Sequence, residues 1–385
     1  MRVCVVAEYY PRPDDPVSGV WAHRQALAAR AEGCEVQVLA LDRPLPSAMA
    51  LGDPKRLRRE LDAIRARPRH ARIDGIDVEY VRYLSPPRER SYAAWYRYAR
   101  RPLARALGRV DVDLIHAHYA TPAGAAAQAY AAARHIPLVV SVHGGDLLTP
   151  LLQAPATRLR VAHVLSRAAA VLCNSAATRD RAAALCGRSD HMRVVHLGAD
   201  VPDRLPPKSG EAIATLGHVI PRKRHIDVLE ALVHLPDVRW IVIGDGPELP
   251  RLRQRAAALG LDDRVELLGA LPHEEAMATL ARARMMVLPS IDEAFGVAYV
   301  EALAQGAPAV GVAGEGGPEE IARLTDAIVL VPPRDPRALA AALERHLADP
   351  AGLERLAERG REAVRANFTW KACGEATVRA YRKAT

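Results

Sequence analysis

Residues 285–312 read MMVLPSIDEAFGVAYVEALAQGAPAVGV. A short apolar run ends at Pro289, a loop follows, Gly296 opens a helix-forming run, and a second apolar run completes the stretch at residues 308–312. A strand, a helix and a second strand in this order form the repeating unit of a parallel β-sheet. Because the same alternation continues along most of the chain, the sequence predicts an α/β fold.

The alternation falls into two series. In the first half we expect strands at 3–8, 36–41, 113–118, 137–144, 170–175 and 192–198. The run VPDRLPPKSG (201–210) has no apolar periodicity and is typical of a linker between domains. A second series follows, with strands at 212–218, 239–244, 264–268, 285–289, 308–312 and 327–331. We therefore expect two doubly wound, Rossmann-like domains whose strand carboxyl ends face a shared ligand-binding cleft.

Length and composition agree with this organisation. A chain of 385 residues is too long for one ordinary core. No apolar run approaches the ~18 residues of a transmembrane helix, and the first strand begins without a signal-peptide pattern. The five cysteines are scattered without CxxC spacing, which argues against a disulfide framework or a zinc site. We expect a cytoplasmic protein, either free or held peripherally at the inner face of a membrane.

The net charge of +8 is unevenly distributed. Residues 1–200 carry 29 Lys and Arg against 19 Asp and Glu, whereas residues 201–385 carry 24 against 26. This asymmetry predicts an anionic partner for the first domain only.

Residues 88–109, RERSYAAWYRYARRPLARALGR, form a basic aromatic segment. Helical periodicity places one set of side chains on a common face: Tyr92, Trp95, Tyr96, Ala99, Leu103 and Leu107. One interpretation is a surface that docks on anionic lipid headgroups or cradles an anionic acceptor. The alternative is a helix packed on its own domain with a solvated basic rim. No nucleic-acid motif is present, so nucleic acid is not an expected partner.

The loop and helix at residues 291–305 suit an anionic sugar ligand. Gly296 leaves the helix N-terminus sterically open, so its N–H groups can face a diphosphate. Glu293 lies before that terminus, and Glu301 lies about 7.5 Å beyond Gly296 along the helix axis. One carboxylate could bind hexose hydroxyls and the other a ribose diol. Two such residues in isolation are more often a capping Glu and a solvated helical Glu, and only the flanking sequence favours the sugar-binding interpretation.

The stretch EAFGVAYVEALAQGAP resembles the E-x7-E signature of family 4 glycosyltransferases, which are retaining enzymes of the GT-B fold. Further stretches share this resemblance: YYPRPDDPVSGVWAHRQ, LGHVIPRKRHIDVLEAL, IVIGDGPE, VELLGALPHEE, VLPS, GEGGPEE and FTW. It implies an acceptor-binding domain at 1–202 and a nucleotide-sugar-binding domain at 203–368. A helix at 369–385 is expected to cross back to the first domain.

The resemblance also implies roles for individual residues. Glu293 would contact the donor hexose and Glu301 the ribose, and the backbone of Phe295, Gly296 and Val297 would lie beside sugar and phosphates. We predict Glu293, His143 and Lys223 as the catalytic residues.

In members of the family, the side chains of an Arg and of a Lys five residues later bind the donor diphosphate. In ATLGHVIPRKRH, Lys223 matches the Lys, but His218 stands where the Arg is expected. An imidazole is largely neutral at pH 7 and supplies little charge, so Arg222 or Arg224 would have to compensate. A solvated helix start is the alternative for this basic cluster.

Weaker matches extend the predicted site. Gly244 would let the backbone approach the nucleotide, and main-chain groups near Leu271 would contact the base. In the first domain, Gly19 would approach the donor phosphates, and His143 in SVHGGDL would reach the donor sugar. Asp146 is expected to order this loop, and Glu315 to be either a sugar contact or a solvated loop residue. His116 and His118 are expected to be plain strand-end residues. Asp111 and Asp113 are expected to form a pair that binds no metal.

The resemblance favours a front-face reaction in which the leaving phosphate deprotonates the acceptor hydroxyl and no metal is required. The donor would be a UDP-hexose or GDP-mannose, and the acceptor a glycan, a lipid-linked sugar or a small molecule. The rival interpretations are a sugar-nucleotide epimerase or a phosphorylase on the same fold, and a non-catalytic glycan-binding protein. His218 in place of Arg is the feature that favours the last of these.

Overall fold

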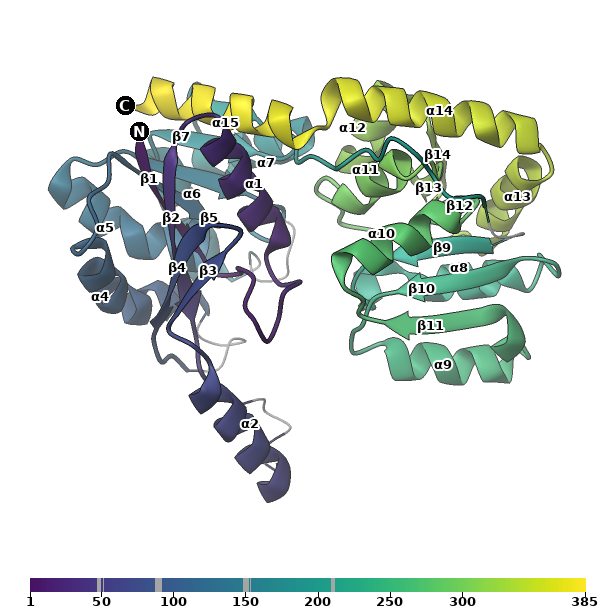
Figure 1. Cartoon of the computed structure of the whole chain (residues 1–385), viewed down its shortest axis with the longest axis horizontal. Helices are drawn as coiled ribbons and strands as arrows, with labels where there is room; N and C mark the ends of the chain where they lie inside the picture. The colour runs from purple at the N-terminus through teal and green to yellow at the C-terminus, as the bar shows by residue number, and fades with distance from the viewer. Residues whose placement is uncertain (47–49, 51, 87–91, 148–151, 153, 209–211) are drawn as a thin grey trace. The chain divides into compact units, whose positions relative to one another are not determined.

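The computed structural model describes residues 1–46, 50, 52–86, 92–147, 152, 154–208 and 212–385. These residues form two compact units (Figure 1). Unit 1 comprises Met1–Asn174, Thr178–Val195 and Cys373–Thr385, and unit 2 comprises Ser175–Ala177 and His196–Ala372. Residues 88–91 of the basic aromatic segment and residues 209–210 of the predicted linker lie outside the described residues.

Unit 1 contains an eight-stranded sheet in the order β3-β4-β2-β1-β5-β6-β7-β8. Its strands are β1 (Arg2–Ala7), β2 (Glu35–Asp42), β3 (His70–Ile73), β4 (Ile76–Arg82), β5 (Leu114–His118), β6 (Leu138–Val142), β7 (Ala170–Cys173) and β8 (Met192–Val194). Every pairing is parallel except that of β3 with β4. The strand order reverses between β1 and β5, so the loops that follow these two strands diverge to opposite faces of the sheet.

The hairpin of β3 and β4 is the main departure from the predicted fold. It places an antiparallel edge on a sheet that the alternation predicted to be wholly parallel. The hairpin turns at Asp74 and Gly75, both with positive φ (47° and 77°). Such a two-residue turn matches the natural twist of a hairpin, and Asp-Gly is a strong signal for it. The turn residues are therefore a local signal for the hairpin, but they are not part of the βαβ alternation.

The helices of unit 1 are α1 (Val20–Ala31), α2 (Pro54–Ala66), α4 (Trp95–Leu107), α5 (Ala125–Arg134), α6 (Pro155–Arg167), α7 (Ala176–Cys186, whose first two residues belong to unit 2) and most of α15 (Trp370–Ala384). Short helical turns lie at Tyr92–Ala94 and Ala120–Gly124. Figure 1 shows α2 extending away from the sheet of unit 1. The buried core combines the small and branched side chains of β1, β5, β6 and β7 with those of α4 and α5.

Helix α4 shows which face of the basic aromatic segment is buried. Trp95, Leu103 and Leu107 are at most 4% exposed and belong to the core of unit 1. The arginines of the helix are exposed instead: Arg97, Arg100, Arg101 and Arg105. The aromatic face therefore packs inside the protein, and the basic rim faces solvent.

Unit 2 contains a six-stranded parallel sheet in the order β11-β10-β9-β12-β13-β14. Its strands are β9 (Ala212–Leu216), β10 (Arg239–Ile243), β11 (Val265–Gly269), β12 (Met285–Val287), β13 (Ala309–Val312) and β14 (Ile328–Val331). Its helices are α8 (His225–Leu232), α9 (Leu249–Ala258), α10 (His273–Arg282), α11 (Val297–Ala304), α12 (Gly316–Thr325), α13 (Pro336–Leu347) and α14 (Pro350–Asn367). Figure 1 shows β9, β10 and β11 side by side, as the strand order requires.

The two parallel-sheet units confirm the predicted α/β fold class, and each of the six strands predicted after residue 211 overlaps an observed strand. In unit 2 the strand order reverses between β9 and β12. Loops that follow strands at such a reversal leave a crevice where α/β proteins bind ligands. Among the described residues, no helix is both long enough and apolar enough to cross a membrane.

Candidate active site

The loop after β12 carries Glu293 into the start of α11. Gly296 precedes the helix with φ of 87°, a left-handed conformation that favours glycine. A Cβ at Gly296 would lie 2.4 Å from the ring of Tyr299, and the hydroxyl of Tyr299 donates to the carbonyl of Leu288 at 2.5 Å. Because this ring is buried and tethered, glycine is required here. It leaves the N-terminal N–H groups of α11 without a capping side chain.

The loop after β9 carries Lys223 to the same place. A short turn, Pro221–Lys223, follows β9, and the carbonyl of Arg222 accepts the N–H of Ile291 at 2.8 Å. Lys223 Nζ donates to Glu293 Oε2 at 2.5 Å, and Ser290 Oγ donates to the same oxygen at 2.9 Å. The structure thus joins two predicted residues that are 70 positions apart.

Glu293 is charged although it is 9% exposed. Burial alone would raise the pKa of its carboxyl group, but the charges of Lys223 and Arg222 and the hydrogen bonds from Lys223 and Ser290 outweigh burial and lower that pKa. The guanidinium of Arg222 lies 3.7 Å from Glu293 Oε2. Glu315, which the sequence left between two roles, accepts the backbone N–H of Glu293 at 2.9 Å and so fixes the loop.

Glu301 lies one turn and a half along α11, and its side chain is 16% exposed. The imidazole of His273, at the start of α10, lies 3.9 Å from its carboxylate. Phe295 is buried and stacks on His196 at 5.6 Å between ring centroids, so it acts as a packing residue of the loop. A buried ammonium group beside an uncapped helix N-terminus can bind an anion, and the two carboxylates can accept hydroxyl groups.

The remaining predicted residues of unit 2 lie on neighbouring strand ends. His218 is exposed immediately after β9. Gly244 follows β10 with φ of 150°, and a Cβ there would lie 2.0 Å from the carbonyl oxygen of Gly217. Glycine at this position therefore has a structural reason within the protein itself. Leu271, half-buried, lies between β11 and α10.

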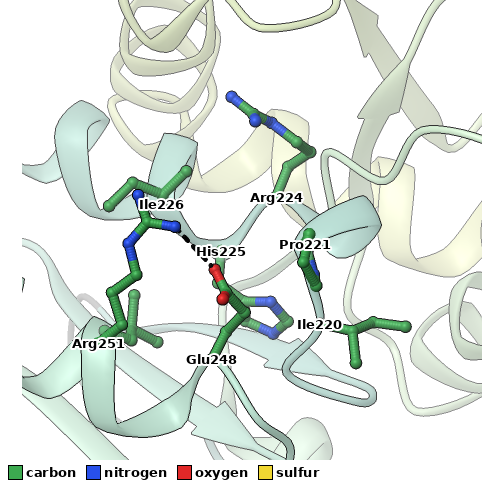
Figure 2. Close-up of a pocket in the computed structure, with 8 residues that line it drawn as sticks. Ile220, Pro221, Arg224, His225, Ile226, Glu248 and Arg251 are labelled. Carbon is green, nitrogen blue, oxygen red and sulfur yellow. Dashed lines mark hydrogen bonds and ion pairs between the residues drawn. The ribbon is translucent and has the colours of Figure 1, made fainter.

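A small cavity of about 100 Å³ adjoins the Lys223 turn at the N-terminal ends of α8 and α9. It is lined by Ile220, Pro221, Arg224, His225, Ile226, Glu248, Arg251 and Leu252. Figure 2 shows the guanidinium of Arg251 facing the carboxylate of Glu248, a 3.2 Å hydrogen bond, with the imidazole of His225 beside them. Arg224, which precedes α8, donates to the carboxylate of Asp227 at 2.9 Å, so its charge is already paired with that of Asp227.

Gly19 and His143 belong to unit 1. Gly19 precedes α1 with φ of 72°, and a Cβ there would lie 2.3 Å from the backbone of Tyr9. His143 follows β6, and its Nε2 forms a 2.9 Å hydrogen bond with Nδ1 of His118. The buried Asp146 accepts the N–H of Ala120 at 2.6 Å, in agreement with an ordering role for this loop.

Three sets of polar contacts were not predicted from the sequence. Ser290 follows β12 within the VLPS stretch, and a serine near a strand carboxyl end is the local signal for its contact with Glu293. Glu320 accepts the N–H of Ala176 at 2.7 Å and bonds His196 at 2.7 Å, and no local pattern announces this contact. The carboxylates of Asp111 and Asp113 pair with Arg2. Within the described residues, no group of three or more His, Cys, Asp or Glu side chains is arranged to hold a metal ion.

Family models identify the class of protein that this fold and these residues define. Residues 18–202 match the model described as Glycosyltransferase Family 4, and residues 200–363 match Glycosyl transferases group 1. The two matches together cover most of the chain. The chain belongs to the family 4 glycosyltransferases, and the predicted family and enzyme class are confirmed.

Individual relatives agree with this assignment. The chain is 29% identical to the alpha-D-kanosaminyltransferase of Streptomyces kanamyceticus over 75% of this chain and 81% of that protein. It is 24% identical to the putative teichuronic acid biosynthesis glycosyltransferase TuaC of Bacillus subtilis over 96% and 95% of the two chains. A match of 38% identity to an exopolysaccharide phosphotransferase of Streptomyces coelicolor spans only 18% of that protein.

Solved structures show the same fold. Sucrose-phosphate synthase from Thermosynechococcus elongatus superimposes with a TM-score of 0.80 at 20% identity over 100% of this chain and 99% of that chain. HepE of Anabaena, in complex with UDP-glucose, superimposes with a TM-score of 0.75 at 18% identity over 99% of both chains. The GT-B architecture of these neighbours is the fold of this chain.

Proposed function

We propose that this glycosyltransferase moves a hexosyl group from a nucleotide diphosphate sugar to an acceptor hydroxyl with retention of anomeric configuration. A UDP-hexose is the favoured donor, with GDP-mannose as the alternative. The acceptor is a glycan, a lipid-linked sugar or a small molecule, in cell-envelope polysaccharide or glycolipid synthesis. Residues 1–202 form the acceptor domain, residues 203–368 the donor domain and residues 369–385 the crossover helix.

One observation carries the proposal. Lys223 and Glu293 meet at the point where the strand order of unit 2 reverses, directly beside the uncapped N-terminus of α11. A buried cation, a helix N-terminus and a carboxylate at the ligand-binding end of a parallel sheet suit a ligand that joins a diphosphate to a sugar. A solvated helix start, the alternative for the basic cluster, does not account for a lysine that is 9% exposed.

The Lys223–Glu293 pair has a consequence for donor binding. In the structure, the ammonium group that would hold the diphosphate is bonded to the carboxylate that would hold the hexose. Binding of the donor would separate these charges: the diphosphate takes Lys223, and the sugar hydroxyls take Glu293. The exposed Arg222 lies close to Glu293. It could therefore bind the phosphates together with Lys223 and supply the positive charge that His218 lacks.

The proposed chemistry follows from charge placement. As the bond between the sugar and the diphosphate breaks, negative charge develops on the phosphate, and Lys223, Arg222 and the N-terminus of α11 stabilise it. The leaving phosphate oxygen takes the proton of the acceptor hydroxyl on the same face of the sugar, so configuration is retained. Glu293 and Glu301 orient the hexose and the ribose, and no metal ion is required.

Similar proteins support the choice of donor and acceptor. HepE binds UDP-glucose, which favours a UDP-hexose. TuaC is named for teichuronic acid biosynthesis, and a uronic acid carries a carboxylate. The exposed arginines of α4 suit an anionic acceptor or the anionic lipid surface to which a lipid-linked acceptor is attached. We accordingly propose a cytoplasmic enzyme that works at the inner face of a membrane.

Nucleotide release with a panel of UDP- and GDP-sugars tests the proposal. Turnover with one donor, lost in Lys223→Met, is the expected result. Binding of the donor without release of nucleotide under any condition, with water or with acceptor mixtures, would support the non-catalytic alternative. Interconversion of one sugar nucleotide into another would support the epimerase.

A further inference from the structure

A buried histidine and a partly buried histidine in unit 1 form a hydrogen-bonded pair. His118 ends β5 and is 1% exposed, and His143 follows the neighbouring strand β6. Nδ1 of His118 and Nε2 of His143 are 2.9 Å apart, and the two rings are nearly parallel, with an interplanar angle of 5°. From the sequence alone, His118 is expected only to be a strand-end residue. The geometry connects it directly to a predicted catalytic residue.

His116 packs against the other side of the pair and is itself bonded to a residue near the end of the chain. The ring of His116 packs on that of His118 at 4.5 Å between centroids. His116 Nε2 bonds Ser141 Oγ at 2.7 Å, and its Nδ1 bonds the hydroxyl of Tyr381 in α15 at 2.7 Å. Both ring nitrogens of His116 are hydrogen-bonded, and the residue is 1% exposed. The His116 ring is therefore held in place, and His118 packs against it. The orientation of His118 is therefore determined by packing.

Each ring of the pair has one nitrogen that makes no hydrogen bond within the described residues. His118 Nε2 and His143 Nδ1 are buried and have no hydrogen-bond partner among the described residues. Burial lowers the pKa of His143 to about 3 and that of His118 well below its ordinary value, so both rings are neutral at pH 7. A neutral imidazole carries one N–H donor and one acceptor lone pair. The pair therefore has two consistent proton arrangements.

In the first arrangement, His118 Nδ1–H donates to His143 Nε2, so the proton of His143 lies on Nδ1. In the second, His143 Nε2–H donates to His118, so the proton of His118 lies on the buried Nε2, which has no acceptor. When a ligand oxygen reaches His143 Nδ1, the first arrangement satisfies both N–H groups, whereas the second leaves one buried N–H unpaired. An unpaired buried donor carries the full cost of its lost hydration. The first arrangement is the one that ligand binding selects.

We propose that His118 is a positioning residue that fixes the tautomer of His143, so that His143 meets its ligand as a hydrogen-bond donor through Nδ1–H and cannot act as a base. The ligand atom at His143 is then an oxygen acceptor, such as a sugar hydroxyl. This inference rests on the proposed function for the identity of the ligand, but the pairing itself does not. Asp146 lies three residues after His143, and its carboxylate accepts the backbone N–H of Ala120. Among the described residues, no carboxylate bonds a nitrogen of either ring.

The pairing is tested by ¹⁵N NMR of protein labelled at histidine, which reads the protonated nitrogen of each ring directly. The full-length wild-type chain with a bound sugar nucleotide is expected to show both His118 and His143 protonated at Nδ1. His118→Phe keeps a ring but removes the nitrogen, and His143 should then show a mixture of tautomers. A single, unchanged tautomer of His143 in His118→Phe would overturn the proposal, as would protonation of His143 at Nε2 in the wild-type complex.

Kinetics provide a second arm. Asparagine places a polar atom near the position of Nδ1, so His118→Asn should retain kcat/KM within about threefold, whereas His118→Phe should lose about tenfold. In a His143→Ala background, His118→Phe should cause no further loss. His191→Phe is the matched control, because His191 is a buried histidine of unit 1 that bonds the Leu165 carbonyl at 2.8 Å. Equal losses in His118→Asn and His118→Phe would overturn the positioning role.

The two arms separate the two claims. If no sugar nucleotide is turned over but the His143 tautomer changes in His118→Phe, the proposed function fails and the pairing stands. If turnover is found and His118→Phe changes neither the tautomer nor kcat/KM, the pairing fails and the proposed function stands.

Discussion

At the scale of single residues, the opposed charges of Lys223 and Glu293 dominate the site. Both residues are only 9% exposed, and Lys223 Nζ lies 2.5 Å from Glu293 Oε2. A buried ion pair contributes little net stability, but removal of one partner leaves an uncompensated buried charge. Under the proposed function, the pair keeps two opposite charges in the protein interior until the donor separates them.

This view predicts the stability of charge variants. Glu293→Gln should destabilise the protein by about 3 kcal/mol, because Lys223 is left buried without its counter-charge. The double variant Lys223→Met with Glu293→Gln should recover most of that loss. Thermal unfolding of both variants measures the effect. A double variant that is less stable than Glu293→Gln would contradict the assignment of the cost to an unpaired charge.

The two carboxylates should differ in ligand binding. Glu301→Ala is expected to raise the Kd for UDP about tenfold, because a ribose contact is lost, equivalent to about 1.4 kcal/mol. Glu293→Ala should leave the Kd for UDP nearly unchanged and mainly lower kcat, since UDP lacks the hexose. Isothermal titration with UDP, together with initial rates, checks both. Equal losses of UDP affinity would contradict the proposed roles.

At the scale of elements, the start of α11 depends on one glycine. Gly296 and Gly314 have nearly the same φ, 87° and 85°, but a Cβ at Gly314 would meet nothing within 4 Å. Alanine at either position carries the left-handed strain of about 1 kcal/mol. Only Gly296→Ala must also displace the tethered ring of Tyr299.

We therefore expect Gly296→Ala to destabilise the protein by at least about 1 kcal/mol more than Gly314→Ala in urea unfolding. It should also weaken UDP binding, because the N-terminus of α11 moves. Matched stabilities of the two variants would mean that the tethered ring of Tyr299 does not restrict this position.

The loop after β6 should show a pH dependence of its own. Burial raises the pKa of Asp146 from its ordinary value of 3.8 to about 7. The folded protein thus holds this proton more tightly than the unfolded chain does. The resulting stability is full below about pH 4 and is lost as the pH rises through about 7.

Asp146→Asn removes this proton equilibrium and keeps an oxygen for the N–H of Ala120. The Tm of the variant relative to wild type should therefore rise between pH 4 and pH 8. The exposed Asp62→Asn serves as the control and should show no such trend. A Tm difference for Asp146→Asn that is flat across this range would show that Asp146 is ionised in the folded protein at all these pH values.

At the scale of the whole molecule, α15 ties the end of the chain into unit 1. Thr377 Oγ1 accepts a hydrogen bond from Gln25 at 2.9 Å, and Tyr381 bonds His116 at 2.7 Å. A Cβ at Gly374 would lie 2.5 Å from the carbonyl oxygen of Ala28 in α1. Gly374→Leu should therefore push α15 away from α1.

Hydrogen exchange measures this effect with an internal control. In Gly374→Leu, amides of α1 and β5 should exchange faster, whereas those of β9 to β14 in unit 2 should be unchanged. Faster exchange in both units alike would indicate a global loss of stability and would contradict a local role for α15.

The fold could be predicted from the sequence more completely than the side-chain contacts could. Hydrophobic alternation and the aperiodic run at residues 201–210 were sufficient to predict two parallel-sheet domains, because these signals act over a few neighbouring residues. The Asp74–Gly75 hairpin was equally local and was missed. The bonds of Lys223 to Glu293 and of His116 to Tyr381 join residues 70 and 265 positions apart, and no periodicity specifies such pairs. For the predicted donor residues, sequence supplied the types and the fold supplied the partners.

The central claim is that the Lys223–Glu293 pair and the N-terminus of α11 form a nucleotide-sugar site of a working transferase. Release of nucleotide from UDP- and GDP-hexoses by wild type and by Lys223→Met, followed by mass analysis of the sugar product, tests it most directly. The account predicts turnover of one donor by wild type and loss of at least about a hundredfold in Lys223→Met, in line with the loss of one preorganised charge contact. Turnover that is unchanged in Lys223→Met would contradict it.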